Sequence, residues 1–197
     1  MQANMTNTIV FINYTQPDNT IISGYAISIM YLGMSLGSIL LGPLADRYEP
    51  KYILTGSLIF TGLGSGLMLL YSATTPFFIL ASALGILGFG LGANATIFMK
   101  IVLANLPPST AGLGTGTYGL FRDLAAPFGV AVFVPMFTNR ITYLTSDTVT
   151  PILPANAAVN AAHMLSIIEL SCIVAAILIV QFLPKIRKNA SLKGEHL

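Results

Sequence analysis

Long apolar runs separated by short polar stretches dominate the chain. The runs cover residues 21–41, 52–71, 77–103, 111–137 and 162–183. Each is about 20 residues or longer, which is enough to cross a bilayer as a helix. Strands of a membrane barrel would instead alternate polar and apolar residues in shorter segments. The pattern therefore predicts an all-α, polytopic transmembrane helical bundle with five spans.

Prolines mark several of the predicted boundaries. Pro43 and Pro50 flank the first connection, 42–51, and Pro184 ends the last span. Proline interrupts helices because it lacks a backbone N–H. The longest predicted loop is 139–160, which is polar and rich in Thr, Asn and Pro.

Residues 1–14 are too polar and too short for a complete span. Asn4, Asn7 and Asn13 are interspersed with apolar side chains, as in the outer part of a helix that lines a polar cavity. We expect this segment to be part of a further, incomplete span.

Composition excludes an ordinary water-soluble domain. Hydrophobic residues make up 54% and charged residues 8% of the chain, whereas a soluble domain is about one-quarter charged. The mean hydropathy is +0.78. The basic residues stand singly beside apolar runs or in the tail, so the net charge of +2 indicates helix orientation and no nucleic-acid partner.

The basic residues predict one orientation in the membrane. Arg47 and Lys51 place the first connection inside, and alternation then places Lys100 inside as well. The tail 184–197 falls on the same side with Lys185, Arg187, Lys188 and Lys193, whereas Arg140 falls outside. We expect a multi-pass plasma-membrane protein with a cytoplasmic C-terminus.

No motif indicates an enzyme, a cofactor or a metal site. Cys172 is the single cysteine, and His163 has no carboxylate at a ligand spacing. The run 114–119 matches GxGxxG, but it lacks the preceding strand that a dinucleotide site requires.

Pairs of glycines four residues apart recur within the predicted spans. They are Gly33 and Gly37, Gly62 and Gly66, Gly88 and Gly92, and Gly112 and Gly116. This spacing lets helix backbones approach closely in lipid. The pairs indicate either tight packing or sliding surfaces in a bundle that changes shape.

Ionisable and polar groups within the spans are the candidates for chemistry, since a charge at the bilayer centre costs at least about 2.5 kcal/mol. Arg122 and Asp123 are adjacent in the fourth span. Consecutive residues point about 100° apart on a helix, so we expect one to face a neighbouring helix and the other a cavity. The alternatives are a structural ion pair and a role in substrate or proton passage.

Glu169 lies about a third of the way into the last predicted span. Its carboxyl either titrates, as proton coupling requires, or is hydrogen-bonded near the interface. Asn94, in the third span, has two alternatives: a hydrogen bond to a neighbouring helix or one to a solute.

The first connection resembles the signature loop of the major facilitator superfamily, G-x-L-A-D-R-x-G-R-K. The matching residues are Gly42, Leu44, Ala45, Asp46, Arg47 and Lys51, whereas Glu49 and Pro50 depart from the pattern. The resemblance implies a gate formed by Gly42, Asp46, Arg47 and Lys51. The departures suit the degenerate copy of the loop in the C-terminal half of the fold.

The stretch 106–131 resembles the late part of fourteen-span drug:proton antiporters. It contains Pro107-Pro108, the small-residue run 111–116 and Arg122, with Ala125-Ala126 where the family has a glycine pair. The resemblance implies the C-terminal half of a major facilitator fold that exports drugs or other small molecules in exchange for protons.

Facilitators bind substrate between two pseudo-symmetric halves. Five spans and a partial one correspond to one incomplete half, which cannot enclose that site alone. The resemblance therefore implies that transport needs a missing N-terminal half or self-association. The alternative is a non-transporting membrane remnant or an interaction module of five helices.

Overall fold

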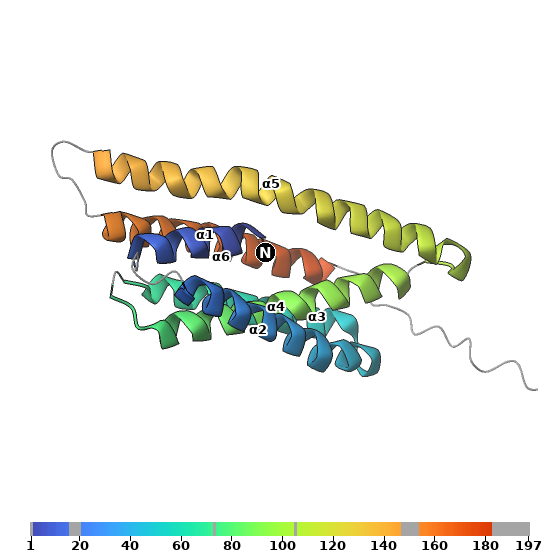
Figure 1. Cartoon of the computed structure of the whole chain (residues 1–197). Helices are drawn as coiled ribbons and strands as arrows, with labels where there is room; N and C mark the ends of the chain where they lie inside the picture. The colour runs from blue at the N-terminus through green and yellow to red at the C-terminus, as the bar shows by residue number, and fades with distance from the viewer. Residues whose placement is uncertain (1, 16–20, 73, 105, 147–153, 183–197) are drawn as a thin grey trace, which may run out of the picture.

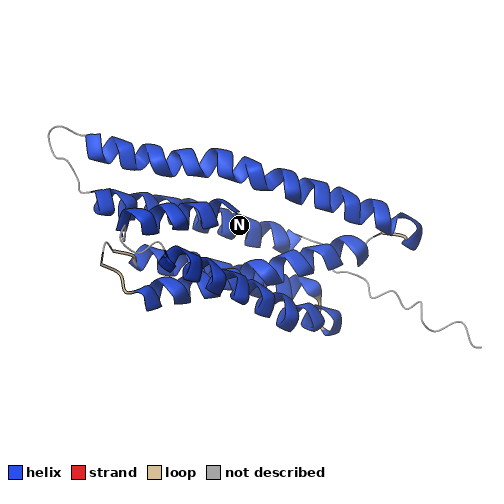
Figure 2. Cartoon of the chain, in the orientation of Figure 1, coloured by secondary structure: helices blue, strands red, loops and turns tan. Residues whose placement is uncertain are grey.

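The computed structural model describes residues 2–15, 21–72, 74–104, 106–146 and 154–182 of the 197-residue chain. Within these ranges the regular structure is helical and no strand occurs (Figure 2). The helices are α1 (Gln2–Thr15), α2 (Ile21–Arg47), α3 (Pro50–Leu67), α4 (Phe77–Ala104), α5 (Ala111–Ser146) and α6 (Pro154–Phe182), with the short 3-10 turns η1 (Met68–Leu70) and η2 (Pro108–Thr110). Five helices, α2 to α6, are long and apolar enough to cross a membrane when η1 is counted with α3. The predicted all-α polytopic bundle is confirmed.

The helices form an elongated bundle with two unequal parts. Figure 1 shows α5 along one side, α1 and α6 in the middle, and α2, α3 and α4 on the other side. Helix α4 packs against both α2 and α3, while α6 contacts α3 and α5. The short helix α1 lies against α5 and α6.

The closest packing in the bundle is between α2 and α4, and glycines make it possible. A Cβ atom added at Gly37 would overlap the carbonyl oxygen of Phe89, and one added at Gly92 would overlap that of Met34. Gly33 and Gly88 face the opposite backbone in the same way. In lipid the hydrophobic effect does not drive helices together, so van der Waals contact at this short range holds them.

Only some of the predicted glycine pairs contribute to such contacts. Gly33 with Gly37 and Gly88 with Gly92 lie at the α2–α4 interface. By contrast, an added Cβ would meet nothing within 4 Å at Gly66, Gly112 or Gly116. On α3 the close approach to α4 is made by Gly64, which faces Leu87.

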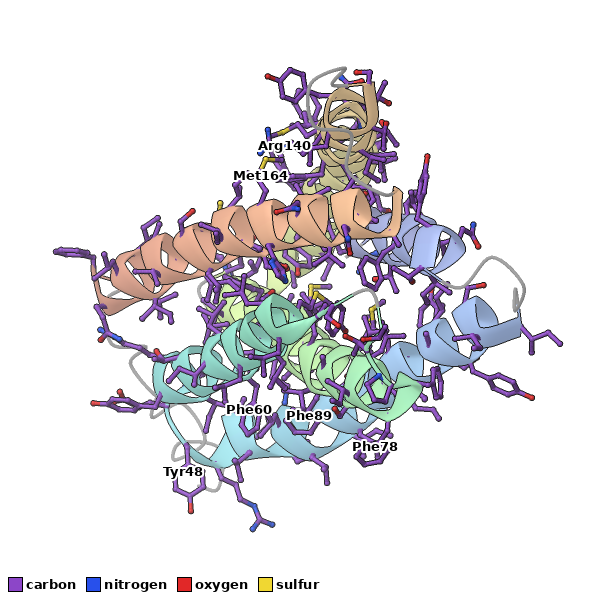
Figure 3. The ribbon with its side chains drawn as sticks, turned by 90° about the vertical axis from the view of Figure 1, so that its left-hand side faces the viewer. Tyr48, Phe60, Phe78, Phe89, Arg140 and Met164 are labelled. Atoms are coloured by element: carbon purple, nitrogen blue, oxygen red, sulfur yellow. The ribbon has the colours of Figure 1, made fainter. Side chains whose placement is uncertain are left out.

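Two apolar clusters lie at opposite ends of the bundle. The first joins α1, α5 and α6 to the ends of α2, α3 and α4, and it includes Phe11, Tyr71 and Phe137. The second joins α3, α4 and α6, and it includes Ala45 at the end of α2. Between α3 and α4, the rings of Phe60 and Phe89 meet edge to face with centroids 5.1 Å apart (Figure 3).

The segment 42–51 is mostly helical, which corrects the expectation that it is a polar connection between two spans. Helix α2 continues through Pro43 to Arg47, and α3 begins at Pro50. Ala45 is buried against the second cluster, which holds this last part of α2 in place. Pro50 begins α3 favourably because its missing N–H would have no partner in the first turn.

The boundaries of the last two spans also differ from the prediction. Helix α5 continues past residue 137 to Ser146, and α6 begins at Pro154, so most of the predicted loop 139–160 is helical. Thr138, Thr142 and Thr145 each donate a hydrogen bond to the carbonyl four residues earlier. The polar composition of this segment favoured a loop. These hydrogen bonds instead allow its polar side chains to lie within the helix.

The α2–α4 interface generates a stability prediction. Gly37→Val should lower the free energy of unfolding by about 2 kcal/mol or more, because the new side chain would overlap the backbone at Phe89. Thermal unfolding in detergent, followed by loss of the monodisperse peak, measures the change. Gly24→Val on the same helix is the matched control, since an added Cβ there would meet nothing within 4 Å. Equal destabilisation by the two variants would contradict the prediction.

Candidate functional site

The predicted gate residue Asp46 forms an ion pair with a helix distant in sequence. Its Oδ1 atom lies 2.6 Å from Nζ of Lys100, near the end of α4. The same ammonium donates a hydrogen bond to the carbonyl oxygen of Gly42, at 2.5 Å. We call Gly42, Asp46 and Lys100 the gate cluster. Lys100 thus lies beside the C-terminal end of α2. A positive charge at this position interacts favourably with the dipole of α2.

The gate cluster lies at the end of the tight α2–α4 interface. One turn before Lys100, the hydroxyl oxygens of Thr96 and of Ser38 on α2 lie 2.6 Å apart. The side chain of Asp46 is 66% exposed and that of Lys100 is 30% exposed. An exposed ion pair contributes up to about 1 kcal/mol, so this contact can break and re-form without unfolding the helices.

Lys51 and Arg47 lie at the same end but do not join the gate cluster. The Nζ atom of Lys51 donates to the carbonyl oxygen of Gln181 in the last turn of α6, at 2.6 Å. Lysine side chains near the C-terminal end of a helix commonly bind its last carbonyls in this way. Arg47 is exposed at the end of α2.

Arg122 and Asp123 pair with each other, which corrects the expectation that they diverge towards a helix and a cavity. The Nε atom of Arg122 lies 3.1 Å from Oδ1 of Asp123. The two side chains are 62% and 71% exposed. The side chains are flexible enough to meet although adjacent helical positions point in different directions. No other described residue covers this part of α5.

The exposed pair is surrounded by apolar side chains. Phe121, Leu124 and Phe128 are exposed on α5, and they line a shallow furrow along this helix. An ion pair in direct contact with lipid would be unfavourable. This face of α5 therefore needs a polar or protein environment when the chain is in a membrane.

Asn94 is buried between α4 and α3. Its Oδ1 atom accepts a hydrogen bond from Ser57, and its Nδ2 atom donates to Oγ1 of Thr61 at 3.1 Å. Ser57 and Thr61 are themselves buried. In this arrangement the hydrogen bonds of Asn94 go to the neighbouring helix.

Glu169 lines a small cavity where α1, α5 and α6 meet the end of α3. It lies close to the middle of the 29-residue helix α6, because that helix begins at Pro154. The predicted position, a third of the way into the span, is corrected accordingly. The cavity has a volume of about 40 Å³, and Asn7, Thr8 and Ser166 supply its other polar side chains.

His163 also has a helix-joining contact. One ring nitrogen, Nε2, lies 3.0 Å from the carbonyl oxygen of Tyr71 beyond η1, while the Tyr71 hydroxyl donates to the carbonyl of Leu80 at 3.2 Å. Among the residues described, no cluster of three His, Cys, Asp or Glu could hold a metal ion.

Sequence reasoning missed two partners. Lys100 contributed only to the predicted orientation of the spans. A single lysine at the end of an apolar run also indicates a contact at the membrane interface. Asn7 was noted as part of a polar segment, but nothing in the pattern connected it with Glu169. The Lys100–Asp46 ion pair and the cavity shared by Asn7 and Glu169 both bring together residues far apart in the chain.

Comparison with known proteins agrees with the resemblance of the motifs. The profile of the Major Facilitator Superfamily matches residues 2–146, a range that contains the gate cluster and the Arg122–Asp123 pair. Solved structures give no match to the chain.

Three curated relatives are transporters by name. The riboflavin transporter RibZ of Clostridioides difficile (strain 630) is 30% identical over 172 residues, covering 86% of this chain and 36% of RibZ. The uncharacterized MFS-type transporter YfiU of Bacillus subtilis (strain 168) is 30% identical over 53% of this chain and 20% of its own length. The MFS-type efflux transporter ffsH of Aspergillus flavipes is 26% identical over 51% of this chain and 18% of its own length. The chain thus spans about a third or less of the length of these three relatives. Because the family profile matches most of its residues, the chain belongs to the major facilitator superfamily.

Proposed function

We propose that this chain is the C-terminal half of a secondary active transporter that exports drugs or other small molecules by alternating access, driven by protons. Membership of the superfamily supports transport, and one relative is named as an efflux transporter. Because the chain spans only part of its relatives, transport requires an N-terminal half or a second copy to complete the substrate pathway.

The observation that carries the proposal is the gate cluster. Gly42 and Asp46 of the signature loop contact Lys100 of α4 through polar bonds at the surface. Such bonds exchange with water at little cost. They are suited to holding the ends of two helices in one of two arrangements, which is what a gate requires.

The orientation of the gate follows from charge. Arg47, Lys51 and Lys100 lie at one end of the bundle, as the contacts of Lys51 with α6 and of Lys100 with α2 require. By the positive-inside rule, we assign this end to the cytoplasmic side of a plasma membrane.

A charge exchange tests the gate. Asp46→Lys or Lys100→Asp alone should lower export about tenfold, because each places like charges together. The double exchange should recover to within about threefold of the original rate, since the pair is restored in reverse. Export is measured as proton-gradient-dependent efflux of ethidium, with riboflavin as a second substrate, from cells expressing the reading frame that contains this chain.

Tyr48→Ser serves as the matched control, because Tyr48 is exposed next to the gate (Figure 3) and outside the gate cluster. Immunoblots of membranes correct for protein amount. A double exchange as inactive as the single variants would contradict a gate role for the pair.

The Arg122–Asp123 pair has a separate test in the same assay. Arg122→Ala and Asp123→Ala should each lower export about tenfold or more, because each leaves an unpaired charge within the span. Unchanged export in both variants would remove the pair from the proposed mechanism. If no gradient-dependent export occurs with the intact reading frame, the alternative of a non-transporting membrane remnant or interaction module is favoured.

A further inference from the structure

One carboxylate at the gate end of the bundle has no partner among the described residues. Glu49 lies between the end of α2 and the start of α3, and it is partly buried. Its Oε2 atom is shielded from solvent and accepts no hydrogen bond from a described residue. Buried polar atoms are normally hydrogen-bonded, and a shielded carboxylate oxygen without a donor is unfavourable. Glu49 therefore needs a donor from outside the described residues.

The groups next to Glu49 in the chain make other bonds. Glu49 occupies the N-cap position of α3, but its side chain makes no capping hydrogen bond. The N–H of Tyr52, a usual target of a capping side chain, donates to the backbone carbonyl oxygen of Glu49 at 3.1 Å. Pro50 has no N–H to donate. The ion pairs of the described residues join other charges.

The end of α6 lies close to this carboxylate. The Nζ atom of Lys51 lies 2.6 Å from the carbonyl oxygen of Gln181, in the last turn of α6. Lys51 follows Glu49 by two residues, so their Cα atoms are at most about 7 Å apart. The chain that continues from α6 therefore starts near Glu49.

The tail 184–197 carries the opposite charge. It contains four basic residues and one acidic residue, and Lys185 follows Gln181 by four positions. At about 3.5 Å per residue, Lys185 has a reach of up to about 14 Å from Gln181. Arg187 and Lys188 follow within the next three positions. Three cations are thus tethered within reach of Glu49.

We propose that the tail 184–197 docks on the segment 48–49 between α2 and α3, where Lys185, Arg187 or Lys188 pairs with the carboxylate of Glu49. The cation supplies the donor that Oε2 lacks, and hydrogen bonds between charged groups are stronger than those between neutral ones. The docked tail joins α6 to the start of α3 a second time, beside the contact of Lys51 with Gln181.

An anionic membrane surface is the other common partner of a basic segment on the cytoplasmic side. A lipid head group attracts the tail equally well, but it leaves the Oε2 atom of Glu49 without a donor. Docking on Glu49 neutralises the tail and satisfies the carboxylate together, so the observations favour the contact within the chain.

Spin-label mobility tests the docking in the 197-residue chain. Cys172 is its single cysteine, so Cys172→Ser with Asn189→Cys places one nitroxide in the tail. In nanodiscs of phosphatidylcholine, Glu49→Gln should shorten the rotational correlation time of the label at least about threefold, because the ion pair is lost. Tyr48→Ser, at the neighbouring exposed position, is the matched control and should leave it unchanged. A label that is equally mobile with and without Glu49→Gln would overturn the proposal.

Charge reversal tests the pairing itself. Glu49→Lys alone should mobilise the label, and so should the joint change Lys185→Glu, Arg187→Glu and Lys188→Glu. All four changes together should restore the original mobility to within about twofold, since the pair is re-formed in reverse. A fourfold variant as mobile as either partial one would overturn the pairing.

Lipid composition separates the two partners of the tail. Docking on Glu49 should occur in phosphatidylcholine alone, where no anionic head group is present. Immobilisation that requires added phosphatidylglycerol and does not respond to Glu49→Gln would overturn the proposal in favour of the lipid surface.

Docking places the tail at the gate, since Glu49 follows Asp46 of the gate cluster by three residues. A regulatory role of this contact rests on the proposed transport function, whereas the docking does not. In the export assay, Glu49→Gln and the joint change of Lys185, Arg187 and Lys188 to Gln should alter the rate by the same factor, at least about twofold.

Their combination should have no further effect on export, because both changes remove one contact. Additive effects would overturn the shared role. An immobilised label that Glu49→Gln releases, without any export by the intact reading frame, would reject the regulatory role and leave the docking established.

Discussion

The close contact between the backbones of α2 and α4 fixes the position of α4, the helix against which α3 also packs. Gly37 and Gly92 each face a carbonyl group of the opposite helix at a distance that excludes any side chain. In a lipid environment, contact at this range replaces the hydrophobic effect as the source of helix association. This contact also places the end of α4 beside the end of α2, so that Lys100 reaches both Asp46 and the carbonyl oxygen of Gly42.

The polar groups of the bundle differ in how firmly they are held. Asn94 is buried with Ser57 and Thr61, so it fixes α3 against α4. The ion pair of Asp46 with Lys100 is open to water and suits a contact that forms and breaks. The Oδ1 atom of Asn7 is buried and has no hydrogen bond from the described residues. The three polar groups thus differ in burial and in how fully they are hydrogen-bonded.

The exposed face of α5 has a different significance. In the described residues, Arg122 and Asp123 neutralise each other but remain uncovered among apolar side chains. In a membrane, this face needs a polar or protein environment. The α2–α4 interface is packed through glycines, whereas the two ion pairs of the described residues lie at one end of the bundle and on α5.

The helices and their lipid environment were predictable from the sequence, because apolar runs of membrane-spanning length are a local property. The signature loop likewise indicated the superfamily from adjacent residues. Only the tertiary structure decided that Asp46 meets Lys100, that Asn7 and Glu169 line one cavity, and that Gly64 rather than Gly66 faces α4. These contacts depend on the rotation and depth of each helix, and a span that is apolar on every face carries little local information about either.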